Sequence, residues 1–236
     1  MGIPGCRANS GGQCGVDPVS KLRVNDSVSV STLWESPRNA KACYVLAHGA
    51  GAGMSHAFMQ SVATALAEKQ IATLRFQFPY MEKGSKRPDS PKLCHATIRA
   101  AVDYARERTD VPLIAGGRSF GGRMASQAQA EEPLPGVVGL AFLGFPLHPP
   151  KAPSDERAEH LDDVKIPLLF LQGTRDELAD LTLLKALVKR LGTRATLKLY
   201  EDADHSFHVR ARSGSTDAKV FEQMMGDFDS WVDNIS

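Results

Sequence analysis

A serine that could serve as a nucleophile lies in the glycine-rich segment 116–122 (GGRSFGG). The segment follows an apolar run and precedes a helix-like stretch, the setting in which a G-x-S-x-G turn exposes a serine hydroxyl at the end of a strand. Gly117 and Gly121 leave room for neighbouring backbone around such a turn. No Lys-Ser or Lys-Thr pair completes a Walker motif, so the pattern favours Ser119 as a nucleophile over a turn shaped for packing or for phosphate.

A serine hydroxyl needs a general base at neutral pH, and a histidine is the usual one. In proteins with a G-x-S-x-G turn this base follows the last strand, where the chain reads EDADHSFH at 201–208. His205 is the first histidine after the last apolar run and lies in an acidic, loop-like stretch. We therefore predict His205 as the base, with His208 as the alternative.

The imidazole of such a base must be held in one tautomer by a carboxylate, and the acid falls between the serine and the histidine in the chain. The apolar run PLLFLQ leads into 173–177 (GTRDE), which supplies Asp176 in that order. Glu177 and Asp180 are the alternatives. An acidic residue after a strand can also cap the next helix, which is a competing interpretation of Asp176.

Acyl transfer also requires donors for the oxyanion of the tetrahedral intermediate. One donor is the backbone N–H after the nucleophile, here that of Phe120, and the second comes from a loop after an early strand. The glycine-rich stretch 48–53 (HGAGAG) is such a loop, and we select Ala50 as the donor. His48 and His56 flank it, but no acidic or cysteine partner stands at metal-site spacing, so we predict no metal.

These groups need strand ends to position them, and the chain supplies short apolar runs separated by segments of helical periodicity. This alternation predicts a parallel sheet with helices on both faces. Upstream, residues 22–33 alternate with a period of two, which indicates a hairpin or an edge strand. We expect a mostly parallel, doubly wound α/β sheet of about seven or eight strands. The apolar runs are 42–47, 71–76, 112–115, 137–143, 167–171 and 195–200.

Helical spacing of apolar residues appears in three longer segments, 58–67, 94–105 and 221–235, and we interpret each apolar stripe as facing the core. No linker divides the chain after its beginning, so we predict one domain over residues 21–236 and a flexible tail over residues 1–20. Only about 20 residues (147–166) separate the fourth and fifth apolar runs, too few for a large lid.

Charge and composition exclude several classes of protein. The chain has 28 basic and 27 acidic residues without a basic block, so a nucleic-acid partner is not indicated. The four cysteines lack zinc spacing and suit a reducing compartment. No apolar stretch has the length of a membrane span or, within the first 20 residues, of a signal peptide. We expect a cytoplasmic protein without a membrane partner.

Six segments together resemble a compact branch of the α/β-hydrolases that is similar to dienelactone-hydrolase relatives. The branch includes many bacterial hydrolases, a testis-expressed hydrolase-like protein and the hydrolase-like domain of a histone-acetyltransferase complex subunit. The resemblance implies the α/β-hydrolase fold, the triad Ser119, Asp176 and His205, and an oxyanion hole at Ala50 and Phe120. Dienelactone hydrolases carry a cysteine where this chain has Ser119, which favours ordinary ester chemistry. The segments are 47–54, 75–82, 116–126, 143–150, 171–179 and 202–209.

The function predicted from these residues is a serine hydrolase, most simply a carboxylesterase for small or short-chain acyl esters, acting as a monomer or homodimer without a cofactor. Thioesterase, amidase or peptidase activity would use the same triad. A non-catalytic interaction module is the alternative from another class. Phe78 and Tyr80 could form an apolar wall for the substrate or could pack in the core. The predicted substrate-binding residues are Gly49, Gly51, His56, Phe78 and Tyr80.

Overall fold

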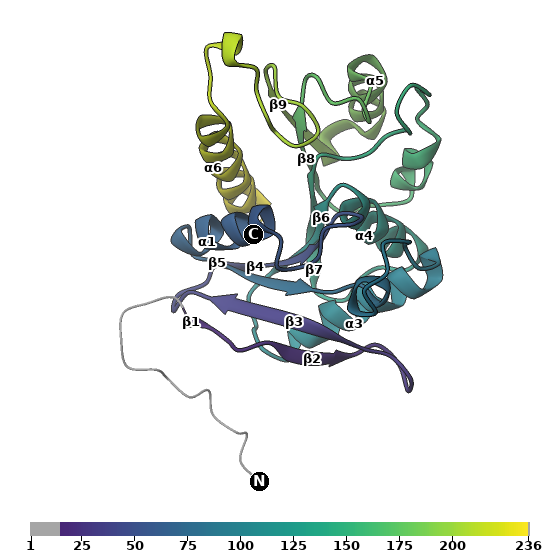
Figure 1. Ribbon diagram of the computed structural model, residues 1–236, viewed down its shortest axis with the longest axis vertical. Helices are drawn as coiled ribbons and strands as arrows, with labels where there is room; N and C mark the ends of the chain where they lie inside the picture. The colour runs from purple at the N-terminus through teal and green to yellow at the C-terminus, as the bar shows by residue number, and fades with distance from the viewer. Residues whose placement is uncertain (1–14, 236) are drawn as a thin grey trace.

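Six parallel strands form the centre of the fold (Figure 1). The computed structural model describes residues 15–235. Every apolar run identified in the sequence is one of these strands, and in space they follow the order β5-β4-β6-β7-β8-β9. Their bounds are β4 (Ala42–Ala47), β5 (Ile71–Phe76), β6 (Leu113–Arg118), β7 (Val137–Leu143), β8 (Leu168–Gly173) and β9 (Ala195–Tyr200).

Three antiparallel strands extend the sheet beyond β5. They are β1 (Gly15–Val16), β2 (Ser20–Arg23) and β3 (Ser29–Ser36), and both β1 and β2 pair with β3. The hairpin expected over 22–33 is therefore present as β2 and β3. The sheet has nine strands, slightly more than expected, because β1 is a two-residue strand that no periodicity could reveal. Strand β1 lies within the tail predicted over residues 1–20, of which residues 1–14 are outside the described residues.

Helices cover both faces of the sheet, as a doubly wound sheet requires (Figure 1). Strand β4 shows the principle: Cys43 and Val45 join one core cluster, whereas Tyr44 and Leu46 join the other. One face packs on α1 (Ala57–Glu68) and α6 (Asp217–Ile235). The opposite face packs on α3 (Pro91–Arg106), α4 (Phe120–Glu131), α5 (Leu181–Leu191) and the 3-10 helix η1 (Glu156–Asp162).

Three short helical segments complete the structure, and all lie in connections. They are α2 (Pro79–Glu82), η2 (Gly192–Arg194) and η3 (Ala211–Ser213). Between β7 and β8 the chain forms η1 and is otherwise irregular, so no large lid is inserted there. Within residues 15–235, none of the helices combines the length and the apolar character needed to span a bilayer.

Candidate active site

The serine turn connects β6 directly to α4. Ser119 has φ 48° and ψ −115°, a strained backbone conformation for a residue with a side chain. A Cβ at Gly117 would lie 2.1 Å from the carbonyl oxygen of Ala47, and one at Gly121 would lie 2.6 Å from the same atom. The turn is therefore pressed against the end of β4, which only glycine permits at these two positions.

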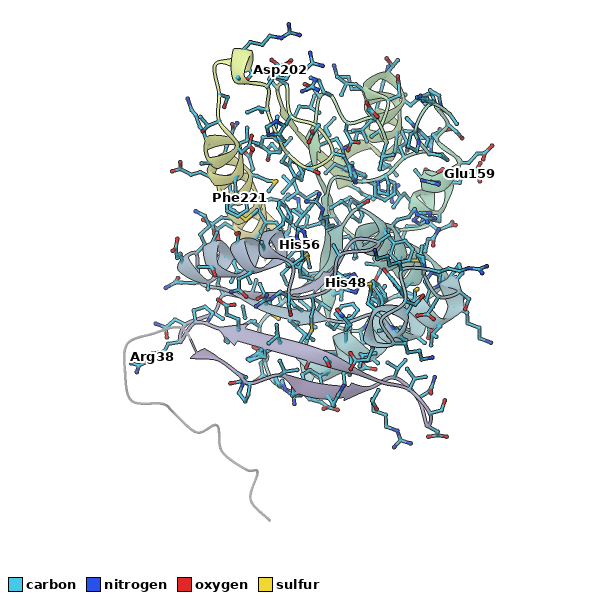
Figure 2. The ribbon with its side chains drawn as sticks, viewed as in Figure 1. Arg38, His48, His56, Glu159, Asp202 and Phe221 are labelled. Atoms are coloured by element: carbon cyan, nitrogen blue, oxygen red, sulfur yellow. The ribbon has the colours of Figure 1, made fainter. Side chains whose placement is uncertain are left out.

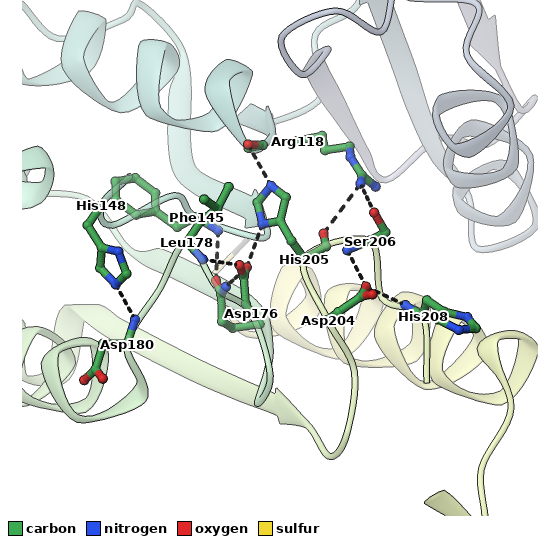
Figure 3. Close-up of polar contacts among 12 residues, drawn as sticks. Arg118, Phe145, His148, Asp176, Leu178, Asp180, Asp204, His205, Ser206 and His208 are labelled. Atoms are coloured by element: carbon green, nitrogen blue, oxygen red, sulfur yellow. Dashed lines mark hydrogen bonds and ion pairs between the residues drawn. The ribbon is translucent and has the colours of Figure 1, made fainter. Parts of the chain in front are cut away.

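The three residues proposed as a triad form a continuous chain of hydrogen bonds (Figure 3). His205 Nε2 lies 2.9 Å from Ser119 Oγ, and His205 Nδ1 lies 2.7 Å from Asp176 Oδ2. The Asp176 side chain is completely buried, whereas that of His205 is 24% exposed. Nδ1–H thus donates to the carboxylate and Nε2 faces the serine hydroxyl, the tautomer that a general base needs.

Two neighbours hold the Asp176 carboxylate in place (Figure 3). The side-chain amide of Gln172 donates to Oδ2, and the backbone N–H of Leu178 donates to Oδ1 at 2.8 Å. Gln172 itself is fixed because its Oε1 accepts from the backbone N–H of Phe145 at 2.8 Å. Sequence reasoning missed Gln172, although a polar side chain at the end of a buried apolar strand was a usable signal.

The alternative triad members have other roles. His208 is exposed and its Nδ1 lies 2.8 Å from Asp217 Oδ2, an ion pair that raises the pKa of His208. Asp180 caps α5, where its Oδ1 accepts from the N–H of Thr182 at 2.9 Å. Glu177 is exposed to solvent. None of the three alternatives takes part in the Ser119–His205–Asp176 chain.

Arg118 joins the serine turn to the loop that carries His205. Its guanidinium lies 3.3 Å from Ser206 Oγ and 3.5 Å from the carbonyl oxygen of His205 (Figure 3). The same guanidinium lies 4.4 Å above the ring of Phe58 in α1. Burial lowers the pKa of Arg118, and the charges of Asp176 and Asp204 partly offset that effect. The side chain therefore serves as a link between α1 and the histidine loop, on the His205 side of the nucleophile.

The imidazole of His48, which is completely buried, supports the loop at 48–53 through two hydrogen bonds. Its Nε2 accepts from the backbone N–H of Phe78 at 3.0 Å, so Nδ1 carries the proton and donates to the carbonyl of Gly49 at 2.8 Å. Burial lowers the pKa of His48 to about 4, which keeps the ring neutral. Gln77 adds a second clamp, because its Oε1 accepts from the N–H of Met54 at 2.8 Å.

The predicted oxyanion donors are the backbone N–H groups of Phe120 and Ala50. The N–H of Phe120 is the first of α4, where a helix offers unpaired donors. Ala50 and Gly51 are exposed, and within the described chain the N–H groups of Gly49 and Ala50 donate no backbone hydrogen bond, whereas the N–H of Gly51 faces the hydroxyl of Tyr80. His56 is the N-cap of α1, because its Nδ1 accepts a hydrogen bond from the backbone N–H of Phe58 (Figure 2).

Phe78 and Tyr80 are buried, with exposed fractions of 0% and 1%. Their rings pack against each other and against Phe120, with centroids 5.6 Å and 6.4 Å from that ring. The two residues therefore match the core-packing alternative and support the side chain that follows the nucleophile. They do not form an open wall of a cleft.

A hollow of about 320 Å³ borders His205 on the side of the β8 and β9 loops. Within residues 17–235, no group of three or more His, Cys, Asp or Glu side chains has the arrangement of a metal site. The hollow is lined by Arg175, Glu177, Leu178, Asp204, His205 and Ser206.

Comparison with known proteins gives one family match and several structural neighbours. The model of the family described as alpha/beta hydrolase domain matches residues 40–233. A dienelactone hydrolase from Anabaena variabilis is similar with a TM-score of 0.74 and 20% identity, covering 94% of this chain and 99% of that chain. A lidless α/β serine hydrolase from Xanthomonas campestris has a TM-score of 0.68 and 20% identity, covering 92% of both chains. Est1E from Butyrivibrio proteoclasticus, solved with ferulic acid bound, has a TM-score of 0.71 and 16% identity, covering 92% of this chain and 98% of that one.

Proposed function

Since the chain belongs to the alpha/beta hydrolase domain family, we propose that it is a serine hydrolase that cleaves small carboxylic esters. The observation that carries this proposal is the unbroken path from Ser119 Oγ through His205 to the buried carboxylate of Asp176. A serine turn retained only for packing would not need a histidine 2.9 Å from its hydroxyl or a carboxylate fixed by two donors.

Acylation begins when Ser119 Oγ attacks the ester carbonyl and its proton passes to His205 Nε2. The new imidazolium is stabilised by Asp176, which stays ionised. The carbonyl oxygen becomes an oxyanion, and the N–H groups of Phe120 and Ala50 are the donors proposed for it. The ester C–O bond then breaks, and the alcohol leaves with the proton from Nε2.

Deacylation repeats these steps with water. His205 Nε2 takes a proton from the water as its oxygen attacks the acyl carbon of the acyl-enzyme. The bond between that carbon and Ser119 Oγ breaks, the proton returns to the serine, and the carboxylic acid is released. No step requires a redox cofactor or a metal ion.

The surroundings of the triad favour small substrates. The connection between β7 and β8 is short, and the hollow beside His205 holds about 320 Å³, at the lower end of the range for small-molecule sites. A carboxylesterase for short acyl chains is therefore our first choice over a lipase.

The proposal is tested by hydrolysis of p-nitrophenyl acetate, butyrate and octanoate. We expect turnover that decreases with chain length and that Ser119→Ala abolishes to background, a loss of several powers of ten. Ser27→Ala, in the exposed turn between β2 and β3, is the matched control and should retain full activity. Circular dichroism verifies that all three proteins are folded. Equal activity of Ser119→Ala and wild type would refute Ser119 as the nucleophile.

A further inference from the structure

Two arginines flank the nucleophile on opposite sides. Arg118 reaches α1 and the histidine loop, as described above. Arg123, one helical turn after Ser119 in α4, turns the other way, and its guanidinium carbon lies 5.9 Å from the ring of Phe120. Burial lowers the pKa of Arg123, the charge of Arg157 lowers it further, and Cys94 of α3 has a smaller opposite effect. Arg123 therefore lies between α3 and η1, away from His205.

Arg123 and Arg157 have no acidic partner. Within residues 17–235 neither guanidinium has a carboxylate oxygen within 4.0 Å, whereas Arg190 of α5 pairs with Asp155 and with Asp162 of η1. Arg123 Nε is buried and donates no hydrogen bond in the described chain. Bringing two like charges together with a buried unpaired donor is costly, and an anion seated between them would remove that cost.

A second unused donor is buried on the same side of Ser119. The backbone N–H of Gly51 faces the hydroxyl of Tyr80, but the hydroxyl itself donates to no described residue, and the Tyr80 ring packs 6.4 Å from that of Phe120. Most buried hydroxyls in proteins are paired. Two buried donors, Arg123 Nε and Tyr80 Oη, therefore belong to side chains that contact Phe120, and neither has an acceptor among the described residues.

The position of Arg157 is fixed by a contact between η1 and α4. Ser126 Oγ donates to the carbonyl of Arg123 at 2.9 Å, so the 2.7 Å contact with His160 requires His160 Nε2 to donate. Burial and the charge of Arg123 lower the pKa of His160 to about 4, so the ring is neutral near pH 7. η1, which carries Glu159 at the right of Figure 2, is thereby anchored to α4, and Arg157 precedes His160 by three residues, one turn of this 3-10 helix.

The chemistry at Ser119 decides which part of a substrate meets these arginines. The leaving alcohol must take its proton from His205 Nε2, so it occupies the His205 side, where the hollow of about 320 Å³ lies. The acyl group then extends to the opposite side, toward Phe120 and Arg123. Four residues of α-helix span about 6 Å, a distance that an acyl chain of a few carbons can bridge.

We propose that Arg123 and Arg157 form a subsite for a carboxylate at the end of the acyl group, so that the preferred substrates are half-esters of short dicarboxylic acids. The inference rests on the proposed esterase function. A planar guanidinium binds a carboxylate through paired N–H donors, and two of them would supply donors for all four of its acceptor positions.

The first test compares p-nitrophenyl half-esters of succinic, glutaric and adipic acid with the neutral p-nitrophenyl butyrate, after subtraction of the rate without enzyme. Wild type should show at least tenfold higher kcat/KM for one half-ester than for butyrate. Arg123→Met and Arg157→Met should each reduce that ratio toward one. Arg106→Met, on the exposed end of α3, is the matched control and should keep the ratio of wild type. Hydrolysis of butyrate without any preference, or a preference unchanged in Arg123→Met, would overturn the subsite and leave the esterase proposal standing.

The second test measures binding without turnover. Ser119→Ala is titrated with monomethyl glutarate and with methyl butyrate by calorimetry, and the same titrations are made on the double variant Ser119→Ala with Arg123→Met. We expect binding of the half-ester that is at least tenfold weaker in the double variant. Equal binding by both proteins would overturn the subsite. Arg123-dependent binding in a protein whose wild type hydrolyses no ester would support the subsite and contradict the esterase function.

Discussion

His48 makes the protein sensitive to acid, and His48→Gln tests this. The ring is completely buried and accepts from the N–H of Phe78 through Nε2, which only the neutral imidazole can do. Protonation in the folded state would break this bond and place a charge in the core. A glutamine amide can accept from Phe78 and donate to Gly49 without titrating.

The magnitude follows from the pKa of His48, which burial lowers from 6.5 to about 4. Between pH 6.5 and pH 4 the unfolded chain binds a proton at this position and the folded chain does not. The free energy of unfolding therefore decreases as the pH is lowered through this range, and the decrease levels off below about pH 4. The contribution of His48 to this loss is about 1 kcal/mol at pH 5.5 and about 3 kcal/mol at pH 4.

Urea unfolding followed by tryptophan fluorescence at pH 7.5, 5.5 and 4 measures the loss. We expect His48→Gln to lose less stability than wild type over this range, by the amount assigned to His48. His208→Gln is the control, because His208 is exposed and its pKa is raised, so its removal should not flatten the acid loss. An acid loss equally steep in His48→Gln and wild type would refute the reasoning.

Two further substitutions test the triad and the serine turn. Asp176→Asn should lower kcat by about 10⁴-fold with little change in KM, because the amide cannot hold the Nδ1–H tautomer of His205. Steady-state kinetics measures both constants, and a loss of kcat below tenfold would contradict the role of Asp176. Gly117→Ala should destabilise the fold by ~3 kcal/mol or more, because its Cβ would lie 2.1 Å from the carbonyl oxygen of Ala47. Gly226→Ala in α6, where a Cβ meets nothing within 4 Å, should instead stabilise by ~1 kcal/mol, and urea unfolding distinguishes the two.

Most of the fold could be predicted from the sequence, because buried parallel strands are uninterrupted apolar runs. All six such runs became β4 to β9, and the alternation over 22–33 became β2 and β3. Strand β1 was missed, because two residues that pair with Glu35 and Ser36 carry no periodicity. The order of strands along the sheet was likewise outside the reach of local patterns.

The candidate site was predictable where function imposes a local pattern and unpredictable where it depends on distant contacts. The glycines around Ser119 and the order of serine, acid and histidine identified residues that the structure brings together. The support of the 48–53 loop by His48 was missed, since its contact with Phe78 joins segments 30 residues apart, and the local hydrogen bond of Gln172 to Asp176 was missed although its polar side chain at the end of an apolar strand was a signal. The unpaired Arg123 and Arg157 could be recognised only once the positions of all carboxylates were known.

Labelling of the nucleophile is the most direct measurement of the central claim. Wild type is treated with a fluorophosphonate probe near pH 7.5, digested, and analysed by mass spectrometry for the modified peptide, alongside Ser119→Ala and His205→Gln. We expect modification at Ser119 in wild type, none in Ser119→Ala, and labelling slowed by several powers of ten in His205→Gln, since the hydroxyl then lacks its base. Modification of a different serine, or a rate independent of His205, would contradict the assignment of this site.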